Sequence, residues 1–164
     1  MANNMVAEAL VRDVLLIART LRKEKNQCIN IATLTFLELL DKGYQPELVV
    51  GSLKCNDKTI FECPSDFRYV HLTGDIEFDG HIWVECAGLI IDIAIMFSIM
   101  NMQELQKFLF IEGFDFSNPT FCTPVSNVEG SGCLSYEKHL LIQDPNVIRC
   151  LKLGALNWLK PTAH

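Results

Sequence analysis

The spacing of apolar residues changes at Gly43, and this change restricts the chain to a mixed fold of helices and sheet. Before Gly43, apolar side chains recur at a helical period over residues 5–25 and again from Cys28 to Lys42, which predicts two amphipathic helices. Gly43 itself is a typical residue for ending a helix. After it the pattern fits strands, which we expect at residues 47–53, 60–63, 67–72, 81–86 and 89–95.

The carboxyl-terminal third contains fewer clear elements. Asn101 with Glu104 three residues later resembles a capping box, which predicts a short helix over residues 102–110. Residues 113–132 are rich in Asn, Pro, Ser and Gly, which is typical of a loop. We expect a last strand over residues 134–142, and then a helix that opens at Asp144-Pro145 and ends near Leu159.

Helices first, an antiparallel sheet second and a closing helix last predict the α+β class. The length of 164 residues favours one domain, 1–164, with its core motif region at residues 26–94. A net charge of −6 disfavours nucleic-acid binding, and no apolar run reaches the roughly 18 residues that suggest a membrane span. The seven cysteines are scattered and no signal peptide is evident, so we expect reduced thiols in a cytoplasmic protein.

Cys28 is the candidate nucleophile, because we expect it in the first turn of the second helix with Asn26 as the cap. The unpaired N–H groups and the positive end of the helix dipole stabilise a thiolate at that position. A cysteine at a helix start also occurs as a small buried apolar residue. The position alone therefore leaves both roles open.

His81 and Asp92 are predicted to meet across a hairpin that turns at Ala87-Gly88. A register in which Val84 faces Ile91 places six apolar side chains on one face of the hairpin. The same register makes Asp92 the diagonal neighbour of His81, within reach of a side-chain contact. Ala-Gly is not a favoured two-residue turn, so a four-residue loop with this register is an equal alternative. An imidazole oriented by a carboxylate is what a general base requires, although the two residues could also be ordinary polar residues of a surface strand.

Two neighbours of this pair have alternative roles. Trp83 is either a core aromatic residue or a substrate contact in the pocket. Glu85 lies on the same face as His81 and could replace Asp92 as its partner.

Four segments follow one another along the chain: Cys28-Ile-Asn-Ile-Ala, Gly43-Tyr-Gln-Pro-Glu-Leu-Val-Val-Gly51, His81-Ile-Trp-Val-Glu85 and Gly88-Leu-Ile-Ile-Asp92. In this order the chain resembles the transglutaminase-like superfamily of papain-like thiol enzymes. The resemblance implies a Cys28–His81–Asp92 triad and a helix start packed on an antiparallel sheet. It also implies acyl transfer or hydrolysis through a thioester on a peptide, protein or small amide, with no cofactor.

For the oxyanion that such a reaction forms, the backbone N–H of Cys28 is one candidate donor. Asn26 and Gln27 are candidates for the second donor, and each is explained as well by a capping or solvent-facing role. Two other functions remain as alternatives. One is a non-enzymatic binding protein on the same scaffold, and the other is a metal-binding regulator that uses Cys55, Cys63 and His71. The sequence does not indicate an oligomeric state.

Overall fold

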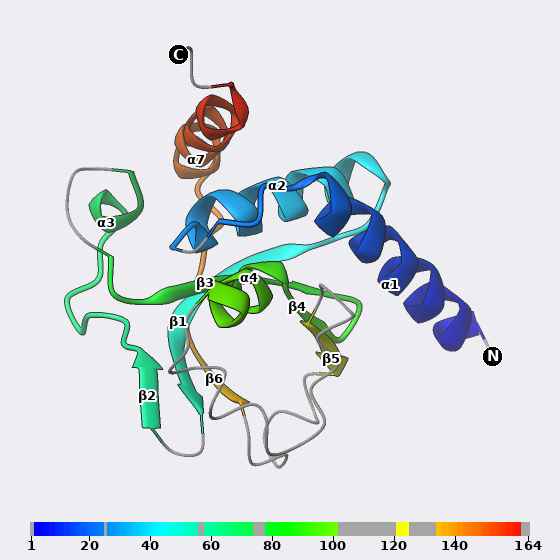
Figure 1. Cartoon of the computed structure of the whole chain (residues 1–164), viewed down its shortest axis with the longest axis horizontal. Helices are drawn as coiled ribbons and strands as arrows, with labels where there is room; N and C mark the ends of the chain where they lie inside the picture. Colours follow the sequence, from blue (N-terminus) through cyan, green and yellow to red (C-terminus); the bar gives the residue numbers. More distant parts are fainter. Residues whose placement is uncertain are drawn as a thin grey trace.

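A computed structural model describes residues 2–24, 26–55, 58–73, 78–101, 121–124 and 134–161 of the chain (Figure 1). The helices are α1 (Ala2–Thr20), α2 (Cys28–Asp41), α3 (Val70–Thr73), α4 (Ile93–Asn101) and α7 (Pro145–Leu159). The strands are β1 (Glu47–Cys55), β2 (Lys58–Phe61), β3 (His81–Cys86), β4 (Leu89–Asp92), β5 (Phe121–Pro124) and β6 (Leu134–Leu141). The described residues thus form an α+β fold. None of their helices has the length and apolar character needed to cross a membrane.

The strands form one six-stranded sheet in which every described pairing is antiparallel. Its order is β2-β1-β3-β4-β5, and β6 pairs with β1 as well. Helix α2 packs on β3 and β1 and contacts α7 on its other side, so it lies between the sheet and α7 (Figure 1). This packing brings the first residue of α2 over the strand that begins with His81.

Helix α2 ends as the sequence predicts, in a Schellman motif around Gly43. Gly43 has a φ of +87°, which a residue without a Cβ adopts at low cost. The N–H of Tyr44 donates to the carbonyl of Leu39 at 3.0 Å, and the N–H of Gly43 donates to that of Leu40 at 2.9 Å. The last carbonyls of α2 are therefore satisfied before β1 begins at Glu47.

The hairpin β3–β4 has the predicted register. Val84 faces Ile91 and Cys86 faces Leu89, with a two-residue turn at Ala87-Gly88 in which both φ angles are positive. Of the two proposed connections, the two-residue turn is the correct one. The six apolar residues assigned to one face do pack into the main core or against it: Ile82, Val84, Cys86, Leu89, Ile91 and Ile93.

The strand predicted over residues 67–72 is wrong, because residues 70–72 belong to the short helix α3 and residues 67–69, which lead into it, are not in a strand. Its backbone groups are satisfied locally: the N–H of His71 donates to the carbonyl of Arg68 at 2.9 Å, and that of Leu72 to Tyr69 at 3.0 Å. The His71 imidazole also accepts the N–H of Arg68 at 3.0 Å. These local bonds replace the pairing that a strand would need.

Other element boundaries differ from the predictions, including those of β1 and β2, which the sequence places at residues 47–53 and 60–63. The first helix ends at Thr20 rather than near residue 25, and Asn101 lies inside α4 instead of capping a new helix. The helix predicted over residues 102–110 lies outside the described residues. Most of the loop predicted over residues 113–132 does too, but residues 121–124 form β5, which pairs with β4. Among the described strands β5 is the last in the sheet order, a position that tolerates Pro124.

Candidate active site

Cys28 is the first residue of α2, and its side chain is half-buried. Gln27 occupies the N-cap position but makes no capping hydrogen bond from its side chain. That side chain instead accepts the Asn30 amide at 2.6 Å. The prediction that Asn26 caps the helix is wrong: Asn26 lies one residue earlier and has a φ of +59°. The first N–H groups of α2, beside the Cys28 sulfur, are thus not capped by Gln27.

His81 begins β3 and is fully buried. Its Nε2 atom lies 2.5 Å from Oδ2 of Asp92, which is also buried. An ionised carboxylate can only accept, so the hydrogen-bonded nitrogen of His81 carries the proton. The other nitrogen, Nδ1, is therefore the atom that can exchange a proton with a nucleophile.

The Asp92 carboxylate accepts hydrogen bonds from three donors. Besides His81, the hydroxyl of Tyr136 donates to Oδ2 at 2.8 Å, and the backbone N–H of Ile95 donates to Oδ1 at 2.9 Å. The bond from Ile95 makes Asp92 the cap of α4, so the chain leaves the sheet at Asp92 and turns into a helix. The strand predicted to run to residue 95 is therefore too long by three residues, at the point where the capping carboxylate satisfies a helical N–H.

Tyr136 is the functional candidate that sequence reasoning did not connect to the site. It lies 44 residues after Asp92, on β6, and reaches the carboxylate because β6 pairs with β1. Burial and the charge of Asp92 raise the pKa of Tyr136 well above its ordinary value, so its hydroxyl remains a neutral donor at physiological pH. No periodicity or motif in the sequence links these two positions.

Aromatic rings surround the His81 imidazole. Phe61 stacks on it with the ring centroids 5.0 Å apart and an interplanar angle of 13°. Trp83 lies 6.2 Å away at 23°, and Tyr136 lies 6.4 Å away in a tilted arrangement. These rings hold the imidazole in place and shield the bond from His81 to Asp92 from water.

Burial acts to lower the pKa of His81, but the charge and hydrogen bond of Asp92 outweigh it and, with Cys28, raise this pKa to about 10. The imidazole is consequently a cation at neutral pH. The contribution of Cys28 shows that its side chain lies near the ring. The buried Nδ1 atom nevertheless makes no well-aligned hydrogen bond to any described residue. Cys28 thus lies near enough to raise the pKa of His81, while no hydrogen bond joins it to Nδ1 in the structure without substrate.

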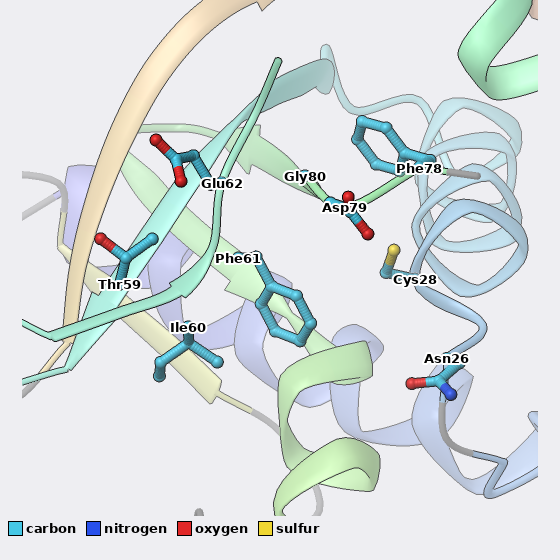
Figure 2. Close-up of a pocket in the computed structure, with 9 residues that line it drawn as sticks. All are labelled: Asn26, Cys28, Thr59, Ile60, Phe61, Glu62, Phe78, Asp79 and Gly80. Atoms are coloured by element: carbon cyan, nitrogen blue, oxygen red, sulfur yellow. The ribbon is translucent and has the colours of Figure 1, made fainter. Parts of the chain in front are cut away.

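The Cys28 side chain faces a cavity of about 610 Å³ (Figure 2). Phe61 separates this cavity from the buried pair, since one ring lines the cavity and also stacks on His81. Of the residues that the structure describes, nine line it: Asn26, Cys28, Thr59, Ile60, Phe61, Glu62, Phe78, Asp79 and Gly80. The nucleophile candidate is therefore accessible from a space large enough for a side chain of a substrate.

The other predicted pocket residues differ in position. Asn26 lines the cavity, whereas Gln27 and Trp83 are not among the lining residues. Trp83 is buried, and its indole N–H donates to Glu85 at 3.1 Å. Glu85 also binds Lys138 at 2.7 Å, so it is engaged elsewhere and Asp92 is the partner of His81.

The metal-binding alternative lacks a ligand cluster in the part of the chain that the structure describes. There, no three His, Cys, Asp or Glu side chains lie close enough together to hold a metal ion. Cys55, Cys63 and His71 therefore do not form the metal site that this alternative requires. Cys55 and Cys63 are buried, and burial raises the pKa of the Cys63 thiol. His71 is instead engaged with the backbone of Arg68 and stacks on Phe67.

Comparisons of the chain with models of protein families, with curated proteins and with solved structures found no match. The geometry around Cys28, His81 and Asp92 is therefore the basis on which we assign a function.

Proposed function

We propose that this protein is a thiol-dependent acyltransferase or hydrolase that acts on a peptide or carboxamide through a thioester, with Cys28, His81 and Asp92 as its triad. One observation carries the proposal. A buried His81–Asp92 pair lies beside Cys28, and Cys28 opens onto a cavity; the charge and hydrogen bond of Asp92 raise the pKa of His81, which favours an imidazolium at this position. A cation next to the sulfur and a helix start under it are the two features that favour a thiolate.

The steps of the proposed reaction follow from the starting state, in which Cys28 is a thiolate and His81 carries the proton. The Cys28 thiolate attacks the carbonyl carbon and forms a C–S bond, while the carbonyl electrons move to the oxygen. When the tetrahedral species collapses, the C–N bond breaks and the imidazolium of His81 gives its proton to the leaving amine. Water, or an amine in the transfer reaction, then attacks the thioester. Neutral His81 takes the proton of this nucleophile, and the C–S bond breaks to restore the thiolate.

The start of α2 also suits the oxyanion. The N–H of Cys28 belongs to the first turn, whose donors have no partner within the helix. The side chain of Asn26 lines the same cavity and is our candidate for the second donor. Gln27 is the weaker candidate, because its side chain accepts from Asn30 and it is not among the residues that line the cavity.

The arrangement of elements supports a relationship with the transglutaminase-like superfamily. The proposed nucleophile opens a helix, the proposed base begins the strand under it, and the carboxylate ends the next strand of the same hairpin. This is the order that the resemblance in the sequence implies.

Acylation by p-nitrophenyl acetate tests the proposal without a known substrate. We expect a burst of nitrophenolate equal to one acetyl group per chain, with the acetyl group on Cys28 by mass spectrometry. The burst should disappear in Cys28→Ala and slow strongly in His81→Gln. Cys150, which is exposed on α7, provides the internal control for an ordinary thiol. If Cys28 reacts no faster than Cys150 between pH 6 and 7, the proposal is wrong and the non-enzymatic binding function is favoured.

A further inference from the structure

The described side chains that line the cavity in front of Cys28 include acidic groups but no basic ones. Two of its nine lining residues, Glu62 and Asp79, are acidic, and none of the nine is basic. Both acidic side chains are exposed, and neither has an ion-pair partner among the described residues. Other acidic residues that lie near cations are paired, such as Asp13 with Lys42 and Glu137 with Lys54. The negative charge in the cavity is therefore available to a ligand.

Of the two acidic residues, Asp79 is the one that faces the proposed nucleophile. Figure 2 shows its carboxylate directed toward the Cys28 sulfur, while the Glu62 carboxylate points away from Cys28. The backbone around Asp79 is fixed, because its carbonyl accepts the N–H of Glu62 at 3.1 Å. Next to it, a Cβ on Gly80 would come within 2.7 Å of the Phe78 ring and 3.1 Å of the Cys63 Cα. The wall that carries Asp79 is thus closely packed against its neighbours.

Aromatic rings complete the walls. Phe61 and Phe78 both line the cavity, so a group near Asp79 also meets aromatic surface. A carboxylate combined with aromatic rings binds an alkylammonium or guanidinium group well, by ion pairing and by cation–π attraction. The same surroundings repel an anion.

We propose that this cavity selects a cationic group of the substrate, a primary ammonium or a guanidinium, through the Asp79 carboxylate with Glu62 adding to the field. The proposal rests on the proposed function, because it describes the specificity of the same site. A lysine or arginine side chain of the acyl donor would supply the cation, and a diamine acting as acyl acceptor would supply it equally well. Asp79 is a specificity-determining residue in either case, and it is distinct from Asp92, which is buried against His81.

Thiol reagents of different charge test the field at Cys28 directly. We expect the cationic trimethylammonioethyl methanethiosulfonate to react with Cys28 about tenfold faster than the anionic sulfonatoethyl methanethiosulfonate. Each rate is first divided by the rate for the neutral methyl methanethiosulfonate, which corrects for the reactivity of the thiol itself. The ratio of the cationic to the anionic rate should fall several-fold in Asp79→Asn, and less in Glu62→Gln.

Asp41→Asn is the matched control, since it removes the same charge at the far end of α2, about 20 Å along the helix from Cys28. Its ratio should equal that of the unaltered protein. A ratio near one, or a ratio that Asp79→Asn leaves unchanged, would overturn the proposed selectivity. A slow reaction with the neutral reagent would instead overturn the proposed function, so the two failures are distinguishable.

Turnover then identifies which substrate carries the cation. For the acyl donor, kcat/KM for the p-nitrophenyl ester of Nα-acetyl-lysine is compared with that of Nα-acetyl-norleucine. For the acceptor, the rate of thioester aminolysis by 1,5-diaminopentane is compared with that by butylamine. We expect the cationic compound to be preferred in at least one pair, and the preference to fall in Asp79→Asn but not in Asp41→Asn. Equal rates in both pairs would contradict the proposal.

Discussion

The hydroxyl of Tyr136 and the imidazole of His81 bind the same oxygen of the Asp92 carboxylate. Asp92 is thereby held from two directions: by strand β3 through His81 and by strand β6 through Tyr136. The Ile95 N–H holds the second oxygen, so the carboxylate has little freedom to rotate away from the base. The carboxyl-terminal part of the chain thus supports a pair that otherwise belongs to a single hairpin.

Tyr136→Phe should slow acylation of Cys28 and lower the free energy of unfolding. The ring remains, but the buried carboxylate loses one donor, and a hydrogen bond to a charged group contributes about 1.5–3 kcal/mol. Burst kinetics and urea unfolding measure the two effects. Tyr44→Phe is the matched control, because Tyr44 also donates to an aspartate at 2.8 Å, Oδ2 of Asp13, outside the site. It should lower stability without changing the burst, and equal burst rates for all three proteins would remove Tyr136 from the site.

Substitutions of Asp92 should separate its two roles. Asparagine is as good a helix cap as aspartate, whereas alanine forfeits about 1 kcal/mol of cap energy, so Asp92→Ala should be the less stable variant by about that amount. Both variants remove the charge that raises the pKa of His81. We therefore expect this pKa to fall by about one unit or more in each, measured by NMR titration of the ring Cε1–H. An unchanged His81 pKa in Asp92→Asn would show that the aspartate does not govern the imidazole.

The same pKa predicts how stability depends on pH. The folded protein holds the His81 proton with a pKa of about 10, above the ordinary value of 6.5. The folded state therefore binds this proton more tightly than the unfolded state does, and the resulting stabilisation is complete below pH 6.5 and is lost as the pH rises toward 10. Urea unfolding gives the free energy of unfolding of the unaltered protein and of His81→Gln. We expect the difference between these two free energies to narrow from pH 6.5 to pH 10, by on the order of a few kcal/mol. A difference that widens with rising pH would contradict the assignment.

The hairpin register could be predicted from the sequence because a strand has a period of two. A shift by one residue would have moved Val84 and Ile91 off the apolar face, so the pattern alone excluded it. Helix α2 could be predicted for a similar reason, because the helical period from Cys28 onward and the stop at Gly43 are both local signals.

The end of β4 could not be predicted in the same way. Ile93, Ala94 and Ile95 form an apolar run that suits a buried strand as well as a buried helix, and all three are buried. The capping bond from Ile95 to Asp92 decides in favour of the helix, and it depends on a carboxylate that is also fixed by His81 and Tyr136. Tertiary contacts over many residues, rather than local propensity, determine this boundary.

The turn of the hairpin allows a stabilising substitution. Ala87 is exposed and has a φ of +50°, a conformation that is costly for alanine, and Gly88 follows with a φ of +77°. Asparagine followed by glycine is the preferred pair for a two-residue turn with both φ angles positive. We expect Ala87→Asn to raise the free energy of unfolding by about 0.5–1 kcal/mol. Urea unfolding measures this gain. Gly88→Ala is the opposing control: no Cβ contact lies within 4 Å, so its expected destabilisation reports backbone strain alone. If Ala87→Asn destabilised the protein, the two-residue turn, and with it the short connection between β3 and β4, would be incorrect.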